Sequence, residues 1–373
     1  MSADPATTAV AAGRVVGSSP LRIFGLASEE RLRRQLARAG AVADLDAASR
    51  IVLLRADWVF DDSLVRGLAK SGDDLALAAD NGQCVALVVP VSRADEAAKA
   101  LLERRAPPGL RAVAATGVAD GYNKTLGKRE APYLMPLDAA GLTAIERRVF
   151  GAVYKGVTDL VTLYFWPAPA LVVTRFCARA GITPNQVTSA SLVLVLAAMV
   201  LFWHGHYVSG LAAAWLMTFL DTVDGKLARV SLLSTKFGNF FDHSIDLVHP
   251  PFWWWAWIVG LPAVGMSLTD PSFVLTVIVG GYVVQRLEEG LFGVVFGVGM
   301  HVWRPFDSRF RLVTARRNPN LLLLTASMLF GRPDLGIVAV AAWTALSLLV
   351  HTVRMIQASI LRTGGPLRSW LAP

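Results

Sequence analysis

The longest stretch without charge limits what this chain can fold into. From Ala180 to Leu220 there is no Asp, Glu, Lys or Arg. A helix needs about 20 mostly apolar residues to cross the hydrocarbon core of a bilayer. Glycine and histidine at 205–206 interrupt the stretch, so it predicts two membrane spans, about 186–204 and 208–229. Later apolar stretches predict four more spans, at about 239–262, 271–298, between Arg317 and Arg332, and 335–356.

Charge divides the chain into two halves. Of all residues, 54% are hydrophobic and only 17% are charged, against about 25% charged in soluble proteins. Residues 1–160 carry ordinary numbers of charges, which predicts a soluble part followed by a membrane part. The formal charge of +8 fits a position beside a membrane. Nucleic acid is a poor match, because no Lys/Arg run of the soluble half is interleaved with exposed aromatics.

The charges of the connecting segments predict the orientation. With a cytoplasmic first half, the inner segments at 175–179, 226–236, 304–317 and 354–368 are all basic, whereas the outer segments hold one basic residue, Arg332. This asymmetry follows the positive-inside rule. Residues 1–20 lack a basic region followed by an apolar core, so no signal peptide is expected. We therefore expect a multi-pass protein of the inner (cytoplasmic) membrane with both termini and the active site in the cytoplasm.

The first half reads as an α/β domain. Apolar runs at 21–26, 50–56, 75–79, 84–91 and 110–115 predict strands, and amphipathic patterns at 29–39, 63–71 and 93–105 predict helices. Their alternation favours an α/β layer with a largely parallel sheet over residues 20–150. Around it we expect a flexible leader (1–19), a polar connector from 119 that ends in a helix near 142–154, a juxtamembrane connector (151–185), the six-helix domain (186–361) and a cytoplasmic tail (362–373). Cys84 and Cys177 lie in different regions and suggest neither a disulfide framework nor a zinc site.

Four carboxylates lie at the predicted inner ends of spans two and three. Asp221 and Asp224 are three residues apart, and Asp242 and Asp246 are four apart, so each pair shares one helix face. Acids at a membrane boundary are costly unless compensated, and oxygen ligands of this kind select hard cations such as Mg²⁺ or Mn²⁺. Two such ions would clamp a diphosphate, while a carboxylate left partly free would take a proton from an attacking hydroxyl. The alternative is ion pairing with the basic residues of the same segment, Lys226, Arg229 and Lys236.

The spacing of these acids matches a known pattern. Residues 221–246 read DTVDGKLARVSLLSTKFGNFFDHSID, which resembles the CDP-alcohol phosphotransferase signature D-x2-D-G-x2-A-R-x8-G-x3-D-x3-D at every fixed position. Upstream, TPNQVT at 183–188 resembles the segment that opens the first span of this family. The resemblance covers about residues 170–360, including the six predicted spans.

The resemblance implies a reaction and a set of roles. A phosphatidyl or phospho-alcohol group would pass from a CDP-linked donor to an alcohol or phospho-alcohol acceptor with release of CMP, in phospholipid or inositol-phosphate-type biosynthesis. The donor would be CDP-diacylglycerol or a CDP-linked alcohol in contact with membrane lipid, and family members commonly form homodimers. The four aspartates would hold two metal ions, with Asp246 as the candidate base. The residues lining the CDP site would be Gly225, Ala228, Arg229 and Gly238.

Arginines mark a candidate site for the acceptor. Four of them cluster before the fifth predicted span: Arg309, Arg311, Arg316 and Arg317. Arginine forks suit a phosphate, either on the acceptor or on the donor headgroup, but simple attraction to the inner leaflet is an equal alternative. Three charged residues interrupt the fourth span: Arg286, Glu288 and Glu289. They would pair with one another, face the substrate cavity, or mark the inner end of this span. Two histidines, His243 and His249, are better explained as hydrogen-bonded side chains than as ligands.

The soluble half shows a partial resemblance of its own. The strand at 51–56 ends in Asp57, like the metal-binding aspartate of Rossmann-like sugar-nucleotide transferases. Those enzymes also need a glycine-rich loop after their first strand, whereas the expected first strand here is followed by Gly25 alone. The order of the two halves resembles the bifunctional enzymes that make CDP-inositol and join it to inositol phosphate. We therefore expect a degenerate nucleotidyltransferase-like domain.

Two further functions fit parts of the pattern. A transporter would use the acids to line a cation path, although such charges usually lie near the midplane of several helices. A membrane-anchored scaffold would use the first half as a nucleotide-binding pseudoenzyme. The position of the acids at the inner boundary of two helices counts against the transporter. The complete set of four acids counts against a scaffold for the membrane half, and for the soluble half that alternative stays open.

Overall fold

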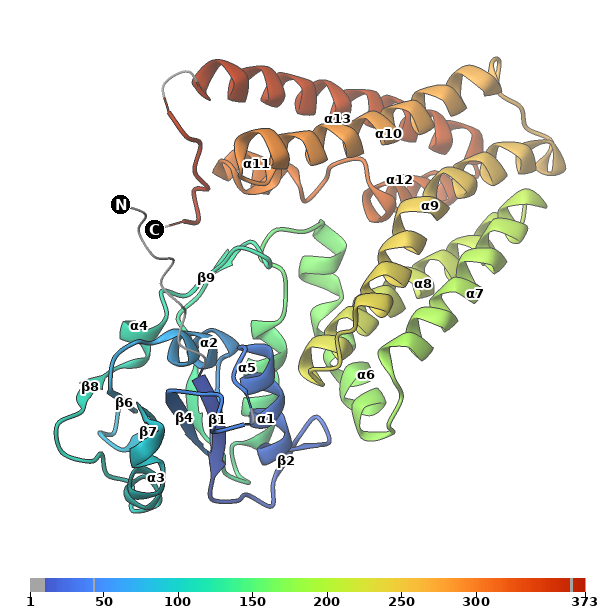
Figure 1. Ribbon diagram of the computed structural model, residues 1–373. Coiled ribbons are helices and arrows are strands. Elements are labelled where there is room, and N and C mark those ends of the chain that lie inside the picture. Colours follow the sequence, from blue (N-terminus) through green and yellow to red (C-terminus); the bar gives the residue numbers. More distant parts are fainter. Residues whose placement is uncertain (1–10, 43, 363–364, 373) are drawn as a thin grey trace.

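The computed structural model shows an α/β layer joined to a larger helical region (Figure 1). The structure describes residues 11–42, 44–362 and 365–372. The sheet and its helices occupy the blue and teal part of the chain, and the long helices fill the rest. The predicted combination of an α/β domain and a helical domain is therefore present.

The central sheet has five strands in the order β1-β4-β7-β6-β8. It pairs β1 with β4 and β6 with β8 in parallel, but β7 runs antiparallel to both β4 and β6. The expectation of a largely parallel sheet was wrong, because a tight turn at 79–83 joins β6 to β7 as a hairpin. A buried strand has the same kind of apolar run whether it pairs in parallel or antiparallel. The sequence therefore did not reveal that β7 is antiparallel to its neighbours. The strands are β1 (Ala11–Val16), β4 (Arg50–Arg55), β6 (Leu75–Ala78), β7 (Cys84–Pro90) and β8 (Arg111–Val113).

Two expected features near the N-terminus differ. The part of the expected leader that is described contains the edge strand β1, whose small residues (AAGRVV) gave no apolar run; residues 1–10 lie outside the described residues. The expected strand at 21–26 is a short hairpin of β2 (Arg22–Ile23) and β3 (Leu26–Ala27), turned by Phe24 and Gly25 at positive φ. The helices of this layer lie close to their predicted positions: α1 (Ser28–Arg38), α2 (Asp62–Lys70) and α3 (Ala94–Leu102), with a short α4 (Ala115–Val118).

The polar connector forms small elements that link the two regions. Strand β11 (Leu134–Pro136) pairs with β5 (Trp58–Phe60), and β9 (Tyr122–Asn123) pairs with β10 (Lys128–Arg129). The predicted helix follows as α5 (Leu142–Ala152). One π-helical turn, η2 (Val161–Phe165), then leads into α6 (Pro167–Arg179).

Six helices stand where the six spans are predicted. They are α7 (Pro184–Trp203), α8 (Tyr207–Val230), α9 (Lys236–Gly260), α10 (Pro271–Phe296), α12 (Arg317–Leu329) and α13 (Pro333–Arg362). Short turns separate them: η3 (Leu261–Val264), η4 (Met300–Val302) and α11 (Pro305–Phe310). A capping box of Thr183 and Gln186 starts α7, and α10 lies along α13 (Figure 1). By length and hydropathy, two helices of the described chain qualify to cross a membrane, α7 and α13; the count of six spans stays a prediction.

One hydrophobic cluster belongs to both regions. Ile23, Phe24 and Val59 of the α/β layer share it with Val223 and Leu227 of α8. Burying a large apolar side chain stabilises a fold by about 1.5–3 kcal/mol, so the shared cluster fixes the two regions to each other. The α/β layer is thus packed against the helices over a common core.

Polar contacts at the same junction hold the end of α8. Arg31 of α1 donates a 2.9 Å hydrogen bond to the backbone oxygen of Val230, and Arg34 donates one of 2.9 Å to that of Ser231. The last carbonyls of a helix have no hydrogen-bond donor within the helix, so these two guanidinium groups supply the donors. Nearby, the buried Glu146 accepts from the backbone N–H of Phe24 at 2.9 Å.

Candidate active site

Two adjacent helices bring the predicted carboxylates together. Asp221 and Asp224 lie in the last turns of α8, and Asp242 and Asp246 in the first turns of α9. Carboxylate oxygens of Asp221, Asp242 and Asp246 all lie within 4.8 Å of one another. Asp224 accepts a 2.7 Å hydrogen bond from Thr188 Oγ1, and its other oxygen is buried with no partner among the described residues. The i,i+3 and i,i+4 spacings therefore form one acidic cluster.

The turn between α8 and α9 explains why the four acids meet. It reverses the chain within residues 231–235, and Leu232 adopts a positive φ of 55°. The side chain of Thr235 then caps α9 by accepting a 2.9 Å hydrogen bond from the N–H of Gly238. The C-terminal end of α8 thus lies beside the N-terminal end of α9.

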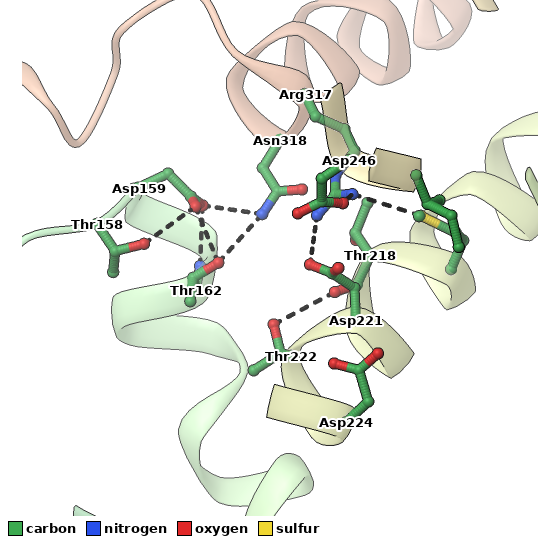
Figure 2. A network of polar contacts seen from close by, with 12 residues as sticks. Thr158, Asp159, Thr162, Thr218, Asp221, Thr222, Asp224, Asp246, Arg317 and Asn318 are labelled. Atoms are coloured by element: carbon green, nitrogen blue, oxygen red, sulfur yellow. Dashed lines mark hydrogen bonds and ion pairs between the residues drawn. The ribbon is translucent and has the colours of Figure 1, made fainter. Parts of the chain in front are cut away.

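Arg317 is the cationic partner of this cluster (Figure 2). Its Nη1 donates to Asp246 Oδ1 and its Nη2 to Asp221 Oδ2, both at 2.5 Å. The nearby cation that sequence reasoning offered as an alternative partner, Lys226, instead lies 3.9 Å from the ring centroid of Tyr154. Arg317 is 71 and 96 residues from the two acids, so no local spacing reveals the pairing.

Asp221, Asp242 and Asp246 line a cavity of about 650 Å³, whereas Asp224 lines a second, smaller cavity. The volume of the main cavity falls in the range of small-molecule sites, about 300–1,000 Å³. Besides Arg317, six cations line it: Lys155, Lys226, Arg229, Arg286, Arg311 and Arg316. Arg309, a predicted phosphate-binding residue, is exposed and is not among the lining residues.

The glycines of the signature lie where a neighbouring side chain or a cavity comes close to the backbone. A Cβ at Gly238 would come within 2.8 Å of Asn185 Oδ1, so this position takes only glycine without a shift. A Cβ at Gly225 would meet nothing nearer than Arg229 Nη1 at 3.7 Å, so its backbone borders open space. A second, smaller cavity shares Gly225 and Asp242 with the main one and is also lined by Ala228 and Gly238.

Glu289 organises the arginines at one end of the main cavity. It forms an ion pair with Arg286 at 3.3 Å and another with Arg316. Nη1 of Arg311 and Nε of Arg316 are buried without a partner among the described residues. Of the alternatives for the charges of the fourth helix, Arg286 and Glu289 both pair and face the cavity, whereas Glu288 accepts a 2.7 Å hydrogen bond from Thr352 Oγ1.

Asp159 forms a polar wall at another part of the cavity (Figure 2). It is buried, and it accepts hydrogen bonds of 3.0 Å from the N–H of Thr162 and from Asn318 Nδ2. Burial alone would raise the pKa of Asp159, but these hydrogen bonds and the positive charge of Arg311 hold that pKa below its ordinary value. Sequence reasoning missed Asp159, because a lone acid in a connector carries no spacing signal.

The histidines add no clear second centre. His249 is buried and its Nδ1 lies 2.7 Å from a backbone oxygen one turn earlier, as expected for an ordinary buried histidine. His243 lines the cavity. Apart from the aspartate cluster, a second group of potential metal ligands, Glu289, His301 and His351, has ligand atoms within 4.8 Å of one another. Because two arginines already pair with this glutamate, a cation has little electrostatic reason to bind there.

The strand-end acid of the α/β layer is engaged in an ion pair. Asp57 follows β4 and accepts from Arg55 at 2.9 Å (Nε) and 2.5 Å (Nη2). The first strand is β1, and Gly17-Ser18-Ser19-Pro20 follows it instead of a glycine-rich loop. The likeness to a nucleotidyltransferase stays a prediction.

Comparison with known proteins settles the class of the helical region. Residues 181–304 match the family model described as CDP-alcohol phosphatidyltransferase. The chain carries a CDP-alcohol phosphatidyltransferase domain. It is accordingly a transferase of phospholipid biosynthesis, an enzyme that moves a phospho-alcohol group from a CDP-linked donor to an alcohol. This family is membrane-integral and generally uses divalent metal ions.

Two curated relatives resemble this domain. The archaetidylinositol phosphate synthase of Pyrococcus horikoshii is 27% identical over 171 residues, which cover 44% of this chain and 80% of that protein. The phosphatidylinositol phosphate synthase of Mycobacteroides abscessus is 34% identical over 116 residues, 30% of this chain. That second match spans about half (52%) of the relative's length.

Proposed function

We propose that this CDP-alcohol phosphotransferase joins a CDP-activated lipid of the CDP-diacylglycerol class to an inositol phosphate, releasing CMP. The observation that carries the proposal is one cavity lined both by an acidic cluster and by half-buried arginines. The names of both relatives, each an inositol phosphate synthase, support the choice of acceptor.

The acidic cluster fits the divalent metal that the family uses. Three of its carboxylates converge within 4.8 Å, and Asp224 keeps a buried oxygen without a partner. We propose that all four acids, Asp221, Asp224, Asp242 and Asp246, hold two Mg²⁺ or Mn²⁺ ions. When bound, these ions would neutralise the diphosphate and stabilise the charge that develops on departing CMP. The oxygen-only donor set is the one that hard cations prefer.

The nucleotide would lie over the small residues of the signature. Gly225 borders both cavities, and Gly238 lets Asn185 approach the start of α9. We propose that these glycines, with Ala228, admit the CDP group to the backbone, and that the guanidinium of Arg229 binds its phosphate. The diphosphate would then reach the acids of α8 and α9.

Asp246 is the proposed base. Its side chain is 37% exposed, against 17% for Asp221, so it is the more accessible of the two acids that Arg317 bridges. In the proposed step it accepts the proton of the acceptor hydroxyl while that oxygen bonds to the lipid-side phosphorus. The bond from this phosphorus to the bridging oxygen breaks, and CMP leaves with that oxygen.

The half-buried arginines of the cavity would bind the phosphate of the acceptor. Arg311 and Arg316 have unpartnered N–H groups in the cavity, and Arg286 lies beside them. Guanidinium groups bind phosphate oxygens in a bidentate manner. Arg309 is exposed, so we leave it out of this site.

The six helices are proposed to place this cavity at the cytoplasmic face. Helices α7 and α13 are long and apolar enough to span a bilayer. The basic segments all lie on the side of the acidic cluster in the predicted topology, in line with the positive-inside rule.

A donor and acceptor panel tests the proposal. The purified full chain in lipid nanodiscs with Mg²⁺ should release CMP from CDP-diacylglycerol only when inositol phosphate is added. Asp246→Asn should lower kcat by at least 100-fold, whereas Asp95→Asn, an acid 93% exposed on the α/β layer, should leave it unchanged. CMP release at the wild-type rate by Asp246→Asn would remove that residue as the base, and inactivity with every CDP donor would refute the function.

A further inference from the structure

Asp159 and Asn318 form a wall of the cavity in which the phospho-alcohol substrate is proposed to bind, and this wall differs in chemistry from the arginines. Asp159 and Asn318 line the same cavity as the acidic cluster, and both are buried, at 7% and 5% exposure. One precedes η2 and the other lies in the first turn of α12, and Asn318 Nδ2 donates a 3.0 Å hydrogen bond to Asp159 Oδ1 (Figure 2). Neither residue belongs to the CDP signature.

This wall offers one hydrogen-bond acceptor without a partner in the described part of the chain and one that is weakly paired. The amide oxygen Oδ1 of Asn318 is buried with no partner among the described residues. Asp159 Oδ2 has one strong donor, Thr162 Oγ1 at 2.9 Å, and a weak one, Thr158 Oγ1 at 3.5 Å. Asp159 Oδ1 accepts from Thr162 N–H and Asn318 Nδ2, so all of the about four acceptor positions of this carboxylate have a donor, and only the 3.5 Å contact with Thr158 is weak. Leaving a buried acceptor unpaired, as at Asn318 Oδ1, costs about 1–3 kcal/mol. The wall is therefore suited to a ligand that donates hydrogen bonds.

Its charge excludes a phosphate as that ligand. The negative carboxylate and the amide oxygen both repel phosphate oxygens, whereas hydroxyl groups donate to both. The arginines proposed to bind phosphate, Arg286, Arg311 and Arg316, line the same cavity, and the charge of Arg311 also acts on Asp159. One cavity thus presents cations that can bind a phosphate and hydrogen-bond acceptors that can bind hydroxyl groups.

The wall is also close to the reacting groups. Asn318 directly follows Arg317, which bridges Asp221 and Asp246. Consecutive side chains of α12 therefore reach the acidic cluster and Asp159 (Figure 2). The wall and the proposed base, Asp246, thus line one cavity.

We propose that Asp159 and Asn318 select the acceptor by binding the hydroxyl groups of a polyol ring. This inference rests on the proposed function and adds the determinant of acceptor specificity: a phospho-alcohol with several hydroxyls is favoured over one with few.

Two acceptors of equal phosphate charge test the idea. CMP release from CDP-diacylglycerol is measured with myo-inositol 1-phosphate and with glycerol 3-phosphate, for wild type and for Asp159→Asn. We expect wild type to favour the inositol phosphate in kcat/KM. The variant should raise KM for inositol phosphate at least 10-fold, change its kcat less than 3-fold, and change KM for glycerol phosphate less than 2-fold.

A matched variant separates recognition from folding. Asp307 is likewise buried (4% exposed), is ion-paired with Arg354, and does not line the cavity. Asp159 is instead held by hydrogen bonds. Asp307→Asn should lower Tm at least as much as Asp159→Asn without changing the preference between acceptors. If Asp159→Asn does not fold, Asn318→Ala replaces it, with the same expected loss of preference.

The outcomes distinguish the two proposals. No CMP release by wild type with any donor refutes the proposed function. CMP release with no preference for inositol phosphate in wild type, or an equal loss for both acceptors in the variants, overturns the polyol wall alone.

Discussion

Arg31 holds the turn between α8 and α9 from the α/β side, and its removal should loosen the nucleotide end of the cavity. Its guanidinium, 3% exposed, donates to the last carbonyls of α8 at Val230. The turn that follows contains Leu232 at a positive φ of 55°, a conformation that costs a non-glycine residue about 1–2 kcal/mol. Such a turn persists only while its surroundings hold it.

The magnitude follows from the bond that is lost. A hydrogen bond from a charged donor contributes about 1.5–3 kcal/mol, and each 1.36 kcal/mol changes an equilibrium tenfold. Arg31→Met should therefore raise the local opening equilibrium of residues 228–235 by about 10- to 150-fold. Since Arg229 lies within this segment and lines the cavity, KM for the CDP donor should rise as well.

Hydrogen exchange measures this effect directly. Amides of 228–235 in the variant should exchange faster by the same factor, while those of α3 keep the wild-type rate. The control is Arg33→Met, because Arg33 is 66% exposed and lies 3.7 Å from its nearest acid, Glu30, a surface pair worth about 0–1 kcal/mol. Equal exchange of 228–235 in wild type and Arg31→Met would show that the α/β layer does not support this turn.

Three further predictions concern other parts of the molecule. A Cβ at Gly260 would overlap the backbone oxygen of Phe202, so Gly260→Ala should destabilise the protein by about 1–3 kcal/mol and lower Tm. Gly293→Ala, with no atom near the new Cβ, should leave Tm equal or raise it. Burial lowers the pKa of His301 to about 3, against the opposing hydrogen bond to Glu289. An unfolded histidine binds its proton near pH 6.5, so this residue makes stability fall as pH drops from 6.5 toward 3. His301→Gln should flatten the Tm–pH curve in that window, and an unchanged slope would contradict the assignment. Finally, a chelator should abolish CMP release and added Mg²⁺ restore it; activity that survives exhaustive chelation would argue against the metal site.

The correct predictions about the helical region came mostly from local sequence patterns. The charge-free stretch and the glycine at 205 located α7 and α8 to within a few residues. The i,i+4 spacing placed Asp242 and Asp246 on one face of α9, and the turn before α9 brings both within 4.8 Å of Asp221. Helical periodicity and short-range spacing suffice for such features because their partners are near in the sequence.

Features that depend on distant partners were missed. The ion pairs of Arg317 and the hydrogen bond between Asn318 and Asp159 join residues separated by 71 to 159 positions. The strand β1 escaped because its small residues resemble a flexible leader, although it pairs with β4 along its whole length. The mixed sheet was missed for a related reason, since an apolar strand does not encode the direction of its neighbour.

The hydrophobic cluster common to both regions also sets an order of assembly. Ile23 and Phe24 leave the ribosome about two hundred residues before Val223 and Leu227, their neighbours in that cluster. Domains generally fold as units during synthesis at about 5–20 residues per second, so these apolar side chains would wait at least ten seconds for their partners. During that interval the α/β layer would remain a target for chaperones or for aggregation. Production of this protein should therefore depend on the speed of helix insertion, and separate expression of the two halves should yield an insoluble first half.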